Sequence, residues 1–111
     1  MLPSANRLKA YEAEKVKKEG NLMHSVDFSV IIRKKDKKEK SKFGVIVSKK
    51  VASLAVHRNR IKRAIFEAVR RNIDRVPTGY DMIFLPKSSI AKKMTDEIMR
   101  EVEGFLKRKF Q

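Results

Sequence analysis

Cysteine is absent from this chain of 111 residues. Without a thiolate, the protein can form neither a disulfide framework nor a zinc site built on cysteine. Long apolar runs are absent as well, because none approaches the roughly 20 residues that a helix needs to span a bilayer. The first residues lack the apolar core of a secretory signal. By default, we therefore expect a cytoplasmic protein that has no membrane partner.

The motifs of a protein-based nuclease or nucleotide hydrolase are also missing. There is no glycine loop of the Walker type. Asp27, Asp74 and Asp81 form no motif at metal-ligand spacing, and His24 and His57 have no catalytic signature beside them. A structural role or a passive RNA contact is the preferred interpretation of each histidine. We expect no catalytic residue and no metal ligand in the polypeptide itself.

Acidic residues are few compared with basic ones. The chain has 13 Asp and Glu against 28 Lys and Arg, which gives a formal net charge of +15. Because such an excess repels itself in a folded protein, an anionic partner is the natural explanation. Nucleic acid is the first candidate, and a membrane surface is the second. The length and the apolar fraction of 41% indicate one RNA-binding domain, residues 1–111, with a modest core.

The cations are most concentrated in one short run, Arg58-Asn59-Arg60-Ile61-Lys62-Arg63. The residues that follow keep a helical period, which predicts a helix from about Leu54 to Ile73, capped by Ser53. Its apolar stripe is expected to be Ile61, Ala64, Ile65, Ala68, Asn72 and Ile73. The arginines roughly opposite that stripe are Arg60, Arg63, Arg70 and Arg71.

A rigid comb of arginines suits a repeating polyanion. The asparagine within the run, Asn59, adds a neutral donor and acceptor for sugar or base edges. The alternative is a solvated charged face, but such faces usually alternate in sign. This one carries six cations and a single anion, Glu67, between Arg58 and Arg71.

The rest of the chain alternates between strand and helix patterns. In order, we expect a helix at about 6–19 that stops at Gly20-Asn21, strands at 26–34, 43–48 and 81–85, a connector at 88–94, and a helix capped by Thr95. The lysine-rich stretch 34–42 is expected to be a mobile hairpin loop, either a solubilising tip or a loose RNA-contacting arm. Strand 81–85 is apolar on both faces and should be central.

These elements predict an α+β fold, a small sheet of about four strands packed with three helices as a two-layer sandwich. Phe28, Phe43 and Phe84 are expected in the core. The last helix should bury Ile98, Met99, Val102, Phe105 and Leu106.

A strand that ends in Ser48-Lys49-Lys50, followed about ten residues later by a helix with Arg58-Asn59-Arg60, resembles the bacterial ribonuclease P protein component. Weaker matches are Asn6-Arg7-Leu8 and Gly79-Tyr80-Asp81. The resemblance extends from about residue 6 to residue 110.

This resemblance implies the protein subunit of a ribonucleoprotein endonuclease that removes the 5′ leader from precursor tRNA. The catalyst in that family is the RNA subunit, and Mg²⁺ is held mainly by RNA. The implied partners are the catalytic RNA and precursor tRNA, with the protein a monomer within the complex. The family also implies a left-handed crossover in its strand–helix–strand unit, an exception to the usual hand.

Carried over residue by residue, the resemblance implies two sets of contacts. The first set binds RNA and comprises Arg58, Asn59, Arg60, Lys62, Arg63, Lys49, Lys50 and Arg7, with Arg70 added from the same helix face. The second set lines a leader cleft between the sheet and the helices and comprises Phe28, Tyr11, Phe66 and Lys17.

Two departures from the family affect the leader cleft. Many members place two phenylalanines four residues apart in the first helix, where this chain has Ala13 and Lys17. Tyr11 is the only aromatic residue in that helix, and Phe66 stands where relatives often have a basic residue. Because base stacking contributes about 1–3 kcal/mol per base, the leader should depend here on charge, or on Tyr11 and Phe66.

Two other functions remain possible on the residues alone. A small basic structural RNA-binding protein of ribosomal type would have a similar composition. A duplex DNA binder could use the basic helix, although no helix-turn-helix spacing or dimerising heptad supports it.

Overall fold

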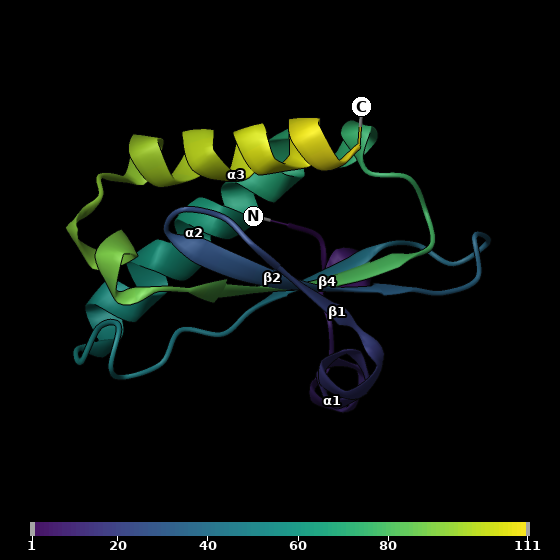
Figure 1. Ribbon diagram of the computed structural model, residues 1–111, viewed down its shortest axis with the longest axis horizontal. Coiled ribbons are helices and arrows are strands. Elements are labelled where there is room, and N and C mark those ends of the chain that lie inside the picture. The colour runs from purple at the N-terminus through teal and green to yellow at the C-terminus, as the bar shows by residue number, and fades with distance from the viewer. Residues whose placement is uncertain (1, 111) are drawn as a thin grey trace.

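The computed structural model describes residues 2–110, and in it three α-helices pack on the two faces of a four-stranded sheet (Figure 1). The elements are η1 (Ser4–Asn6), α1 (Ala10–Glu19), β1 (Asn21–His24), β2 (Phe28–Lys34), β3 (Lys42–Val45), α2 (Ala55–Arg71), η2 (Ile73–Arg75), β4 (Tyr80–Pro86), η3 (Ser88–Lys92) and α3 (Thr95–Lys109). The expected α+β class, with about four strands and three helices, is confirmed.

The strand order in the sheet is β1-β2-β4-β3. Strand β4 is central as predicted, since it pairs antiparallel with β2 and parallel with β3. Strands β3 and β4, joined through α2, therefore form a parallel strand–helix–strand unit. The expected hairpin across residues 34–42 is wrong, because β4 lies between β2 and β3: Phe84 is the partner of both Val30 and Val45.

The main core lies between the sheet and helices α2 and α3, which cover one face together. The ring of Phe28 lies 5.6 Å from that of Phe84 and 5.7 Å from that of Phe105. The predicted stripe of α2 is buried at Ile61, Ala64, Ile65, Ala68 and Asn72, with Ile73 half-buried. In α3 the stripe is buried except for Met99, which is half-buried. The periodic spacing of apolar residues along each element was enough to identify these core residues.

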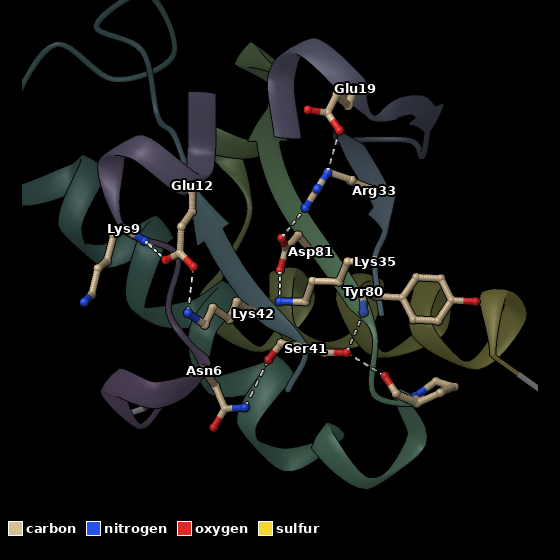
Figure 2. A network of polar contacts seen from close by, with 11 residues as sticks. Asn6, Lys9, Glu12, Glu19, Arg33, Lys35, Ser41, Lys42, Tyr80 and Asp81 are labelled. Carbon is tan, nitrogen blue, oxygen red and sulfur yellow. Dashed lines mark hydrogen bonds and ion pairs between the residues drawn. The ribbon is translucent and has the colours of Figure 1, made fainter. Parts of the chain in front are cut away.

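Helix α1 lies alone on the opposite face of the sheet (Figure 1). It buries a single residue, Val16, and polar contacts hold the rest of it (Figure 2). Glu12 pairs with Lys42 of β3 at 2.6 Å, and Glu19 pairs with Arg33 of β2 at 3.2 Å. The two-layer description thus fits α2 and α3, while α1 adds a helix on the second face.

Gly20 ends α1 as predicted, but without the left-handed conformation that glycine often adopts at a helix end. Its φ is −83°, so no left-handed conformation is involved. A Cβ atom there would lie 2.6 Å from Cγ2 of Ile31 and 2.7 Å from the carbonyl oxygen of Val16. Glycine is therefore required because the end of the helix lies directly against the sheet.

Several element boundaries differ from the expectation. Strand β1 was missed, because its four residues are exposed and show no alternation. Val26 is 79% exposed and lies outside β2. Neither predicted cap, Ser53 or Thr95, makes a side-chain hydrogen bond that caps its helix. The residue before α2 is Leu54, and Thr95 is already the first residue of α3. In α3, the Glu97 carboxylate accepts the Met94 backbone N–H instead.

Candidate RNA interface

The first turns of α2 hold five of the predicted RNA-binding residues, and two of these make structural bonds. The Arg58 guanidinium donates hydrogen bonds to the carbonyl oxygens of Ala52 at 2.9 Å and Ser53 at 2.7 Å. It therefore closes the loop that leads into α2. Since a carbonyl oxygen leaves the positive charge in place, Arg58 can still attract an anion.

Arg60 has a similar second role. Its guanidinium reaches the carbonyl oxygens of Lys93 at 3.2 Å and Ala91 at 3.5 Å, which joins α2 to the connector before α3. The comb of arginines predicted from sequence is thus not uniformly available, because Arg58 and Arg60 are half-buried and anchored.

The other cations of this region are presented differently. Lys62 is half-buried and Arg63 is exposed, and neither makes a hydrogen bond or ion pair with another residue of the described range 2–110. Asn59 likewise makes no side-chain hydrogen bond within the described residues. Lys49 and Lys50 are exposed in the turn after β3. These side chains can reorient towards a phosphate without breaking an internal contact.

The C-terminal half of α2 is an ion-pair cluster. Arg70 donates two hydrogen bonds to the Glu67 carboxylate, at 2.8 and 2.6 Å, and Arg71 donates one at 3.2 Å. The bond from Arg70 is the main cause that lowers the pKa of Glu67 to about 2. Because Glu67 stays ionised, it offsets part of the charge that Arg70 was expected to offer to RNA.

A cleft of about 460 Å³, which we call the α1–α2 cleft, opens between these two helices at the β3 edge of the sheet. Its lining residues are Ser4, Arg7, Leu8, Lys9, Ala10, Ala13, Phe43, Gly44, Val45, Ile46, Lys62, Phe66 and Ile83. The lining contains three cations and no carboxylate. The α1–α2 cleft therefore has the charge of an anion-binding site.

Rigid elements position the functional side chains of the α1–α2 cleft. Arg7 forms a parallel β-bridge with Phe43, and the next residue, Leu8, donates its N–H to the Phe43 carbonyl at 2.9 Å. Lys62 and Phe66 are four residues apart in α2, so they lie on one face of the helix, one turn from each other. Two segments far apart in sequence thus place Arg7 and Lys62 on the same cleft.

Of the four residues predicted to line a leader cleft, Phe66 is the one that lines the α1–α2 cleft. Phe28 does not, because it is fully buried against Phe84 and Phe105 on the other side of the sheet. That expectation is wrong: the side chains of a strand alternate, and Phe28 belongs to the core face.

The two α1 residues lie elsewhere. Tyr11 is 71% exposed and borders a separate hollow, which it shares with Arg33, Lys35 and Asp81. Lys17 is exposed, pairs with Glu14 at 3.3 Å, and is absent from the lining of the α1–α2 cleft.

The cleft also contains residues that sequence reasoning had not assigned to it. Ile46, the residue just after β3, is an exposed apolar side chain in the cleft lining, and Ala13 contributes from α1. The signal for Ile46 was present, since a large apolar residue on the outer face of the predicted strand 43–48 has no core to fill.

Acidic and histidine side chains do not gather into a metal site within residues 2–110. His24 is exposed, and its Nδ1 lies 2.8 Å from the Ser29 hydroxyl. In the same range, no helix has both the length and the apolar character needed to cross a membrane.

Comparisons with known proteins agree with this geometry. The family described as Ribonuclease P matches residues 2–109. The ribonuclease P protein component of Fusobacterium nucleatum is 39% identical over 85 residues, which are 77% of this chain and 76% of that protein. The corresponding protein of Clostridioides difficile is 38% identical over 82 residues, 73% of this chain and 71% of that protein.

Solved structures show the same fold. The ribonuclease P protein of Staphylococcus aureus superposes with a TM-score of 0.82 at 27% identity, covering 96% of this chain and 98% of that one. The Thermotoga maritima protein gives a TM-score of 0.79 at 27% identity, covering 92% and 96%. The match decides against the ribosomal-type and DNA-binding alternatives. The chain therefore belongs to the bacterial ribonuclease P protein family, which acts in tRNA processing as the protein part of a ribonucleoprotein endoribonuclease.

Proposed function

We propose that this protein binds the catalytic RNA with the first turns of α2 and the adjacent lysine turn, and holds the 5′ leader of precursor tRNA in the α1–α2 cleft. The observation that carries the proposal is the charge of that cleft. Arg7, Lys9 and Lys62 line it together, and no carboxylate does. The hollow beside Tyr11 is different, because five carboxylates line it along with four cations.

The catalytic RNA is assigned to the α2 surface that comprises Lys49, Lys50, Asn59, Arg60 and Arg63. The four cations of this set are donors without acceptor groups, which suits phosphate and sugar oxygens, and the Asn59 amide can both donate and accept. Arg58 contributes charge but chiefly fixes the loop, and Arg70 contributes less because Glu67 holds it.

The chemistry is assigned to the RNA, with Mg²⁺ held there too. Two carboxylates of the protein, those of Asp81 and Glu67, are already paired with cations. Asp81 lies 2.6 Å from Lys35 and 3.3 Å from Arg33, and Glu67 pairs with two arginines. The polypeptide thus acts by binding and positioning, as a monomer within a cytoplasmic complex with catalytic RNA and precursor tRNA.

The test is reconstitution with a bacterial ribonuclease P RNA at low Mg²⁺. The protein should lower the Mg²⁺ requirement and bind precursor tRNA more tightly than mature tRNA. The double variant Arg7→Ala with Lys62→Ala should lose the preference for precursor and keep its affinity for the catalytic RNA. The matched control, Lys15→Ala with Lys18→Ala, removes the same charge from the hollow beside Tyr11 and should retain the preference.

Cleavage of precursor tRNA by the polypeptide without RNA would contradict the proposal. A folded protein that changes neither the Mg²⁺ requirement nor the preference for precursor would contradict it as well.

A further inference from the structure

Among residues 2–110, Phe66 is the only aromatic residue that exposes part of its ring to the α1–α2 cleft. Phe43 borders the same cleft but is fully buried. The Phe66 ring is half-buried: part of it packs against the core, and the remainder faces the cleft. An aromatic ring fixed by the core on one side and open on the other is a platform on which a planar group can stack without further ordering cost.

The opposite wall leaves room for such a group. It is formed by α1 through Ala10 and Ala13, which are both small. The cleft volume of about 460 Å³ falls within the roughly 300–1,000 Å³ of sites that take small organic ligands. A larger residue at position 13 would fill part of the cleft.

The cations beside the ring favour an anionic ligand. Lys62 lies one helical turn before Phe66, and Arg7 comes from the segment that runs beside β3. A planar base with a phosphate on either side matches a ring placed among cations. Bases in a duplex are already stacked on their neighbours, so the ring can accept only an unpaired one.

We propose that the α1–α2 cleft binds one unpaired nucleotide of the 5′ leader, with its base stacked on Phe66 and its flanking phosphates at Arg7 and Lys62. This inference rests on the proposed binding of the leader. It adds that the stacking surface is Phe66 of α2 and that the bound unit is a single nucleotide. In this proposal, the aromatic residue that contacts the leader belongs to α2 and not to α1.

The experiment measures the affinity of the reconstituted holoenzyme for precursor tRNAs in which single leader nucleotides are abasic. With the unmodified protein, one leader position should lose about 5- to 100-fold in affinity when its base is removed. Phe66→Leu should cause a similar loss with the intact leader. In that variant, removing the same base should have no further effect, because the stacking partner is already gone.

Companion variants separate stacking from folding. Phe66→Tyr should keep the dependence on that base. Ala13→Leu, which leaves the core untouched, should weaken leader binding by filling the cleft. Affinity for mature tRNA and for the catalytic RNA should be unchanged in Phe66→Leu, Phe66→Tyr and Ala13→Leu. Tyr11→Leu tests the exposed ring on the other flank of α1 and should retain the base dependence.

Opposite outcomes overturn the inference. It fails if Phe66→Leu still distinguishes the abasic leader from the intact one, or if Tyr11→Leu abolishes that difference instead. It also fails if Phe66→Leu weakens precursor and mature tRNA equally. In these cases the preference for precursor persists in the unmodified protein, and the proposed function stands. If the unmodified holoenzyme binds precursor and mature tRNA equally, both proposals fall together.

Discussion

Lys35 and Asp81 form a nearly buried ion pair in which Nζ lies 2.6 Å from Oδ1, with the two side chains 8% and 5% exposed. Arg33 reaches the other carboxylate oxygen at 3.3 Å and also pairs with Glu19 of α1 (Figure 2). The pair therefore links the start of the lysine-rich loop, the central strand and the helix that forms one wall of the α1–α2 cleft.

Asp81→Asn should destabilise the protein strongly, because it leaves Lys35 buried without a counter-charge. Loss of one partner of a buried pair costs about 3 kcal/mol. Urea unfolding measures the change. The matched control is Glu14→Gln, whose exposed pair with Lys17 should contribute less than about 0.5 kcal/mol. Equal losses in the two variants would show that Asp81 does not hold the network together.

Arg63→Ala should weaken binding to the catalytic RNA without changing stability, since Arg63 makes no internal bond among the described residues. The dependence of affinity on salt should flatten by about one ion. Filter binding across a range of salt concentrations measures both. Lys38→Ala, in the lysine-rich loop, should do much less. If the two variants behave alike, RNA binding is diffuse and no docked α2 surface exists.

Arg58→Ala should affect both RNA affinity and folding. The guanidinium holds two carbonyl oxygens of the loop before α2, and loss of bonds made by a charged donor costs about 1.5–3 kcal/mol. Thermal unfolding measures this loss. Arg58→Lys should restore the charge but only part of the stability, because an ammonium cannot reproduce the planar fork. An unchanged melting temperature for Arg58→Ala would contradict the structural role.

Glu67→Gln should raise RNA affinity and steepen its salt dependence, because it releases Arg70 and Arg71 to bind phosphate. The pKa of Glu67 is lowered to about 2, so its ion pairs are complete above the ordinary value of 4.5 and are lost only as pH falls towards 2. The effect of the substitution should therefore be constant between pH 6 and pH 8. An effect that grows across that interval would implicate a different titrating group.

Glu101→Gln should be tolerated at neutral pH. Burial raises the pKa of Glu101, while hydrogen bonds from Ser89 and Glu101 lower that of Asp27. The Glu101 carboxylate accepts bonds from the Ser25 hydroxyl and the Asp27 N–H, each at 2.9 Å. A glutamine oxygen can accept these bonds, and its amide can donate to the Asp27 carboxylate.

The sign of the pH dependence follows from the raised pKa. The folded state retains the Glu101 proton above the ordinary pKa of 4.5, so stability falls as pH rises through the folded value. Glu101→Gln should therefore gain stability relative to the original chain at pH 7, and the gain should vanish towards pH 4. Urea midpoints at several pH values test this, and a gain that is largest in acid would contradict it.

The periodicity of the sequence predicted α2, α3 and the central strand, because burial of an apolar stripe depends on spacing along one element. Ile61, Ile65 and Phe84 were assigned to the core in this way. The same reasoning failed at β1, an exposed edge strand whose pairing with β2 leaves no pattern in its residues. It also mistook residues 34–42 for a hairpin, since neighbouring strands in sequence need not be neighbours in the sheet.

The sequence by itself determined that this protein is strongly basic and concentrates cations on the Arg58-Asn59-Arg60 helix, because charge and helical period are local properties of the chain. Only the tertiary structure decided how available Arg60 is, because the carbonyl oxygens of Ala91 and Lys93 that hold it lie 31 and 33 residues further along the chain. It also decided that Arg7 and Phe66 line one cleft, because the bridge between Arg7 and Phe43 holds the chain's first segment against β3.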